Sequence, residues 1–124
     1  MSSESLHEAA EKLSPATIDR HRATVSLMEE LEAIDWYDQR IDAATDEALK
    51  EILRHNRDEE KEHAAMVLEW LRRADPKFDA QLRTYLFKEG DIIAAEAEAE
   101  GAAPADENQG CLGIGDLRNE EVAP

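Results

Sequence analysis

Apolar residues recur at spacings of three and four along a stretch that begins at Ser14, which is the spacing of one face of an α-helix. No glycine or further proline interrupts the chain from Pro15 to Ala43. Ser14 is a favourable N-cap, and Pro15 suits the first helical position. The pattern therefore predicts a first helix over residues 14–43. Its apolar seam consists of Leu27, Ile34, Tyr37 and Ile41, with Glu30 among them.

A second stretch follows after a break of three residues, 44–46, in which Thr45 or Asp46 can cap the next helix. This second helix is predicted from about Asp46 to Ala74. Positions separated by four, three, four, three, four and three residues form its seam: Leu49, Leu53, Asn56, Glu60, His63, Val67 and Trp70. Because the break is short, the two helices are expected to form an antiparallel hairpin.

The remainder of the chain is predicted to be shorter or irregular. Asp75 and Pro76 end the second helix and begin a third, which ends near Gly90. Residues 14–89 therefore form the helical domain. Residues 1–13 and 119–124 are expected to be flexible, and the acidic stretch 90–111 is expected to be a disordered or weakly helical linker. The predicted fold class is all-α: a two-helix hairpin plus a short C-terminal helix.

The formal charge of −16 narrows the choice of partners. There is no basic stripe to neutralise phosphates, so we expect no nucleic-acid partner. An anionic membrane surface would repel the chain, and no window approaches 18 consecutive apolar residues, so we expect no membrane partner. The N-terminal stretch lacks the features of a secretory signal, and the single cysteine, Cys111, fits a reducing cytosol. The expected location is the cytoplasm.

Three ionisable residues interrupt the apolar seams: Glu30, Glu60 and His63. Burying a carboxylate is costly unless something compensates its charge. Glu60 and His63 are three positions apart, so they share a helix face and can reach one metal ion. Glu30 and Glu60 are equally distant in sequence from Thr45, so the hairpin places them level with each other. The sequence therefore predicts a metal site with these three ligands.

This ligand set is half of a known arrangement. Ferritin-like di-iron proteins take one Glu from each of two helices and a Glu-x-x-His pair from each of two others. This chain supplies one of each, and a thin hairpin cannot bury much of its own apolar surface. We therefore expect two copies to form a four-helix bundle that holds two metal ions.

Two other interpretations stay open. The three residues could form a buried Glu–His hydrogen bond in a non-catalytic helical dimerisation module whose C-terminal tail binds a partner. Stoichiometric metal binding separates that module from a metalloenzyme. A di-metal enzyme acting on an organic substrate or on peroxide would need a substrate pocket, of which the sequence gives no sign. Manganese or zinc could use the same ligands as iron.

Residues beside the predicted site have both a plain and a functional interpretation. Glu29 and Glu32 lie on a neighbouring face, where they are either a solvated surface or a second, looser metal site on the way in. Trp36 and Tyr37 follow within two turns of Glu30 and are interpreted first as packing residues.

Specific motifs cover most of the helical part of the chain. The stretch from His21 to Trp70 includes Glu-Glu-Leu-Glu-Ala-Ile-Asp-Trp-Tyr-Asp-Gln-Arg at 29–40 and Asn-Arg-Asp-Glu-Glu-Lys-Glu-His-Ala-Ala-Met at 56–66. Leu-Arg-Thr-Tyr-Leu-Phe follows at 82–87. In these motifs the sequence resembles the encapsulated ferritins, which are ferritin-like cargo proteins of encapsulin nanocompartments.

The resemblance implies a half-ferritin whose dimers assemble further into a ring. It implies a ferroxidase centre between two chains, with two iron ions per dimer held by Glu30, Glu60 and His63. Glu29 and Glu32 would be the site at which iron enters, with Trp36 and Tyr37 beside it. The implied activity is oxidation of Fe(II) to Fe(III) by dioxygen, which delivers iron for storage inside an encapsulin shell.

The acidic tail contains an apolar island, Leu-Gly-Ile-Gly-Asp-Leu-Arg at 112–118. It resembles the targeting peptide by which cargo proteins dock inside encapsulin shells. The resemblance implies that Leu112, Ile114 and Leu117 are the anchors. Cys111 and Asp116 stand where the family pattern leads us to expect serine.

Overall fold

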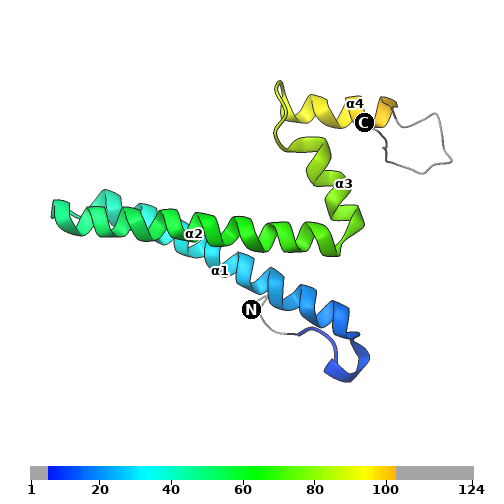
Figure 1. Ribbon diagram of the computed structural model, residues 1–124, viewed down its shortest axis with the longest axis horizontal. Coiled ribbons are helices and arrows are strands. Elements are labelled where there is room, and N and C mark those ends of the chain that lie inside the picture. Colours follow the sequence, from blue (N-terminus) through cyan, green and yellow to red (C-terminus); the bar gives the residue numbers. More distant parts are fainter. Residues whose placement is uncertain (1–5, 103–124) are drawn as a thin grey trace. The chain divides into compact units, whose positions relative to one another are not determined.

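The computed structural model describes residues 6–102, and this part of the chain is entirely helical (Figure 1). A single 3-10 turn, η1 (Ala10–Lys12), precedes four α-helices: α1 (Pro15–Ala43), α2 (Glu47–Ala74), α3 (Pro76–Tyr85) and α4 (Ile92–Ala102). The predicted all-α class is confirmed. The chain divides after Ala74 into two compact units, of which the first contains the α1–α2 hairpin and the second contains α3 and α4. No described helix is long and apolar enough to cross a membrane.

The start of α1 and the turn after it follow from local capping. The Ser14 hydroxyl accepts a hydrogen bond from the Thr17 amide at 3.1 Å, and Pro15 occupies the first turn. After the turn, the Asp46 carboxylate accepts a hydrogen bond from the Leu49 amide at 2.9 Å and caps α2. Because these caps are short-range, the predicted bounds of both long helices agree with the structure to within about one residue.

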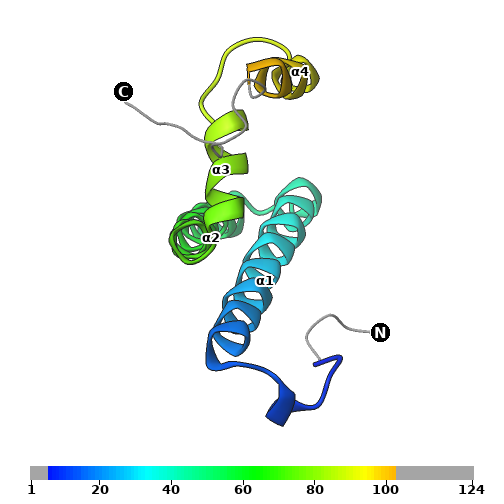
Figure 2. The ribbon, with the colours of Figure 1, turned by 90° about the vertical axis from the view of Figure 1, so that its right-hand side faces the viewer.

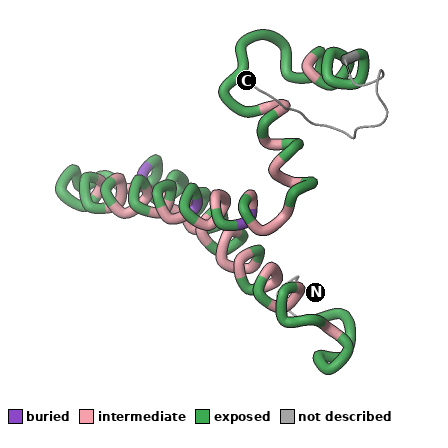
Figure 3. The backbone as a smooth tube through the Cα atoms, turned by 45° about the vertical axis from the view of Figure 1, so that its right-hand side comes forward, coloured by how far each residue is buried: buried purple, intermediate pink, exposed green. Residues whose placement is uncertain are grey.

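The two helices of the hairpin diverge from the turn at 44–46 toward the opposite end, which we call the open end (Figures 1 and 2). Near the turn, the Arg57 guanidinium donates to the Asp38 carboxylate at 3.1 Å and links α2 to α1. Only three apolar residues in the described part are buried, namely Ile41, Ala64 and Leu71, and all lie in this hairpin (Figure 3). The hairpin alone therefore leaves most of its apolar surface in contact with water.

In the second unit, α3 begins at the predicted place and ends earlier than predicted. The Asp75 carboxylate accepts hydrogen bonds from the Lys77 and Phe78 amides at 3.0 and 3.1 Å. The helix was expected to fade near Gly90, whereas it ends at Tyr85. Positive φ angles of 58° at Phe87 and 92° at Gly90 turn the backbone there. Such angles do not belong to a right-handed helix, so the chain leaves the helical path.

The stretch expected to be a linker contains a helix. Residues 90–111 were expected to be disordered or weakly helical, and within them Ile92–Ala102 forms the helix α4. The Asp91 carboxylate accepts a hydrogen bond from the Ala94 amide at 2.8 Å, and alternating Ala and Glu have high helix propensity. The remainder of that linker, the targeting peptide 112–118 and residues 119–124 lie outside the described residues.

Candidate metal centre

The structure brings Glu30, Glu60 and His63 together near the middle of the hairpin. One possible ligand atom from each residue lies within 4.8 Å of the other two. Glu30 comes from α1, while Glu60 and His63 occupy successive turns of α2. We call this group the Glu30–Glu60–His63 cluster. It is the only such group of three His, Cys, Asp or Glu side chains within residues 6–102.

Short distances connect the imidazole to both carboxylates. The Nδ1 atom of His63 lies 3.4 Å from Oε1 of Glu60 and 3.6 Å from Oε1 of Glu30. The carboxylate side chains are 23% and 25% exposed, and the imidazole is 43% exposed. The cluster is therefore half-buried against the hairpin, and one side of it stays open.

The electrostatics of the cluster favour a cation or a proton between its carboxylates. A hydrogen bond with Glu60 raises the pKa of Glu30 above its usual value, and burial and repulsion from the Glu60 charge raise it further. His63 acts in the opposite direction on this pKa. Because two carboxylates face each other, Glu30 holds a proton more tightly than an ordinary Glu does. A divalent cation would relieve the same repulsion.

Two carboxylates and an imidazole are a ligand set that suits Fe(II), Mn(II) or Zn(II). The set is compatible with a metal site, because one donor atom of each residue lies within 4.8 Å of the other two. It also leaves coordination positions open on the exposed side of the cluster.

Glu29 and Glu32 are exposed and do not join the cluster. Their assignment as a second iron site stays a prediction. Trp36 and Tyr37 lie farther along α1, where the Arg40 guanidinium stacks over both rings at 5.9 and 5.5 Å from their centroids. Sequence reasoning missed Arg40, although a cation three and four positions after two aromatic residues is a recognisable helical pattern.

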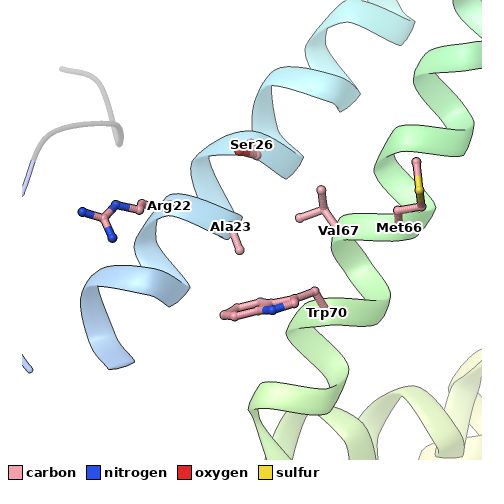
Figure 4. Close-up of a pocket in the computed structure, with 6 residues that line it drawn as sticks. All are labelled: Arg22, Ala23, Ser26, Met66, Val67 and Trp70. Atoms are coloured by element: carbon pink, nitrogen blue, oxygen red, sulfur yellow. The ribbon is translucent and has the colours of Figure 1, made fainter. Parts of the chain in front are cut away.

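A pocket of about 390 Å³ adjoins the cluster on the side of the open end. It lies where α1 and α2 diverge, and Ala23, Val67 and Trp70 project into the space between the helices (Figure 4). Arg22, Ser26 and Met66 complete its lining. Ser26 is one turn before Glu30, and Val67 is one turn after His63. No local sequence pattern indicates this pocket, because it depends on the angle between the helix axes.

The anchors predicted for shell docking, Leu112, Ile114 and Leu117, lie outside the described residues. Their role therefore stays a prediction.

Comparisons with known proteins agree with this fold and show the family. The family described as EncFtn-like matches residues 5–89. An encapsulated ferritin-like protein of Rhodospirillum rubrum is 59% identical over 128 residues, which cover 96% of this chain and 91% of that protein. A ferritin-like protein of Thermotoga maritima is 49% identical over 108 residues, which cover 87% of this chain and 93% of the relative.

A more distant relative and a solved structure extend the comparison. The encapsulin nanocompartment cargo protein EncC of Myxococcus xanthus is 42% identical over 83 residues, or 61% of this chain and 64% of that protein. The crystal structure of a protein from Nitrosomonas europaea superposes with a TM-score of 0.69 at 59% identity. It covers 70% of this chain and 96% of the other.

Proposed function

This chain belongs to the EncFtn-like family, and from that premise we propose that it is a ferroxidase whose active centre is shared between two copies. Each copy contributes Glu30, Glu60 and His63, and two Fe(II) ions bind between them as substrate. Each ion gives up one electron, and dioxygen accepts both electrons. The observation that carries the proposal is that donor atoms of the three side chains lie within 4.8 Å of one another, in seams whose other members are mostly apolar.

The protein's own residues have distinct tasks in this proposal. Glu60 and His63 hold one ion from adjacent turns of α2, which fixes their separation. Glu30 approaches from α1 and supplies a second carboxylate. The neutral imidazole donates its lone pair to the metal, so binding requires both carboxylates and His63 to be deprotonated. Proton release therefore accompanies iron uptake.

We further propose that the chain is cargo of an encapsulin shell in the cytoplasm, as the names of its Rhodospirillum and Myxococcus relatives suggest. The apolar island 112–118 would dock on the shell protein through Leu112, Ile114 and Leu117. Dimers would assemble into a ring, and the shell would store the oxidised iron. Glu29 and Glu32 would lead Fe(II) toward the cluster from the exposed surface.

Native mass spectrometry under anaerobic Fe(II) titration tests the shared site. We expect iron only on even-numbered assemblies, at two ions per pair of chains. Admitting air should then convert the bound iron to Fe(III), which is followed by absorbance. A dimer that takes up no iron would contradict the ferroxidase proposal and favour a non-catalytic dimerisation and docking module.

Variants make the assignment specific. His63→Ala should abolish rapid iron oxidation, because it removes the only imidazole of the cluster. His55→Ala is the matched control, since His55 is an exposed histidine of the same helix that pairs with Glu59 at 3.4 Å. Equal oxidation rates in both variants would show that the chemistry lies elsewhere.

A further inference from the structure

The seam of α2 is symmetrical about the gap between Glu60 and His63. From Glu60 toward the turn, the seam continues after four positions with Asn56 and after three more with Leu53. From His63 toward the open end, it continues after four positions with Val67 and after three more with Trp70. Two antiparallel copies of such a helix present the same series of positions to each other, as a two-fold interface requires.

Two half-buried polar side chains near this seam lack a hydrogen-bond partner. Asn56 occupies a seam position of α2, and Ser26 lines the pocket at the open end. Within residues 6–102, neither side chain makes a hydrogen bond. An amide placed in an apolar interface is costly unless it finds a donor or an acceptor.

We propose that the pocket binds the turn-proximal part of a second copy, so that Leu53 and Asn56 of the partner subunit enter it and this Asn56 hydrogen-bonds to Ser26. The inference rests on the proposed function in one respect: the two-fold axis passes through the shared metal centre. In that register, Asn56 of the partner subunit is level with Val67 and Ala23, one turn from Ser26. Leu53 of the partner subunit is level with Trp70.

The surface around the pocket fits a second copy of this chain. Met66 and Trp70 in the pocket lining are 58% and 44% exposed, and Leu49 and Ile52 near the turn are 45% and 57% exposed. In the proposed register, the open end of each copy packs against the turn end of the other copy, so the contact forms twice in the dimer. Arg22 at the pocket rim also becomes level with Asp35 of the partner subunit, so opposite charges lie at the same height.

The Asn56–Ser26 pair would set the register of the dimer. A shift by seven residues would still match apolar positions of the seam, because the spacing of four and three repeats. It would, however, withdraw Asn56 from the pocket and place Glu60 opposite Trp70, which separates the two metal half-sites. A polar residue at one seam position is a known way to select one register. Asn56 and Ser26 are thus positioning residues for the metal centre.

Distance measurements between spin labels test the proposal on the metal-free dimer. In the full-length Cys111→Ser chain, Glu51→Cys provides an exposed labelling site on α2. We expect one distance. Asn56→Leu should add a second distance, since a shift by seven residues moves the two labels by about 10 Å along the axis. Ser26→Ala should have the same effect, whereas Thr24→Ala, on the exposed side of α1, should not.

A double-mutant cycle supplies the second measurement. Asn56→Ala and Ser26→Ala should each weaken the metal-free dimer about five- to tenfold, and the double variant should be no weaker than either. If the two substitutions weakened the dimer independently, so that the double variant were weaker than either single variant, the proposed pair would be overturned. A single label-to-label distance in Asn56→Leu would overturn it as well. A monomeric wild type would overturn both the pair and the shared site. A dimer in the expected register that fails to bind iron would overturn the ferroxidase proposal alone.

Discussion

Glu30 is a candidate metal ligand whose charge also lowers the stability of the metal-free fold. Its carboxylate faces Glu60 in a half-buried position, and its pKa is raised mainly through that contact. A raised carboxyl pKa means that the folded chain holds the proton more tightly than the unfolded chain does. Above that pKa, ionisation of Glu30 therefore lowers the free energy of unfolding. The metal-free cluster is a weak point of the hairpin that a cation would strengthen.

We predict that Glu30→Gln raises the melting temperature of the metal-free protein at pH 8, on the order of a few degrees. Gln has nearly the same shape and removes one of the two facing charges. The difference should shrink as the pH falls through the raised pKa, because Glu30 is then neutral. Calorimetry in the presence of a chelator measures both effects. Glu29→Gln, at the exposed neighbouring position, is the control, and a lower melting temperature for Glu30→Gln would contradict the argument.

Glu69 shows the opposite shift. Arg72 and Arg73 donate to its carboxylate at 2.6 to 2.8 Å and lower its pKa to about 2. A lowered pKa stabilises the fold above the ordinary Glu pKa of 4.5, and this contribution is lost as the pH falls toward 2. The group is exposed, so solvent screens the interaction.

We therefore predict that Glu69→Gln lowers the melting temperature at pH 7 by only about a degree. The difference from the wild type should disappear between pH 4.5 and pH 2. Thermal unfolding followed by circular dichroism across this range is the measurement. A difference that persists at pH 2 would show that Glu69 acts through packing of its side chain rather than through charge.

Among the elements, the two long helices could be predicted because their signals are local. Ser14 and Asp46 are caps that act within one turn, Pro15 begins α1, and the three-residue turn fixes which positions of the hairpin are level. That geometry was enough to group Glu30 with Glu60 and His63. By contrast, α4 has no apolar face, so it forms from helix propensity and the Asp91 cap. The pocket depends on the divergence of α1 and α2, which no local pattern encodes.

The cap of α3 offers a test at this scale. Asp75 accepts two backbone hydrogen bonds at the start of a helix of ten residues. We predict that Asp75→Ala costs about 1 kcal/mol of local stability, since the Lys77 and Phe78 amides lose their acceptor. A loss of this size corresponds to hydrogen exchange that is about fivefold faster at these two amides. Asp75→Asn should retain the cap, and exchange as fast as in the Ala variant would contradict the assignment.

At the scale of the molecule, the described part of the chain, residues 6–102, has little core of its own. The hairpin consists of two helices of 29 and 28 residues, yet only three of its apolar residues are buried. Large side chains such as Leu31, Ile52 and Met66 are more than half exposed. Association with a second copy would remove these surfaces from water, so folding and association are expected to be linked.

That linkage predicts a melting temperature that rises with protein concentration. Each tenfold increase adds about 1.4 kcal/mol per mole of dimer, which corresponds to several degrees for a chain of this size. Differential scanning calorimetry over three decades of concentration measures the slope. A melting temperature independent of concentration would show that the lone hairpin is stable by itself.

The division of the ligand set between chains has a consequence for timing. Under the proposed function, a newly synthesised chain carries one Glu30–Glu60–His63 cluster, which is half of the ligand set. The chain therefore does not oxidise iron until it associates with a second copy. In dilute solution, turnover would then grow with the square of the amount of protein rather than in direct proportion. Such a threshold would delay the production of insoluble ferric iron until enough chains have accumulated to assemble.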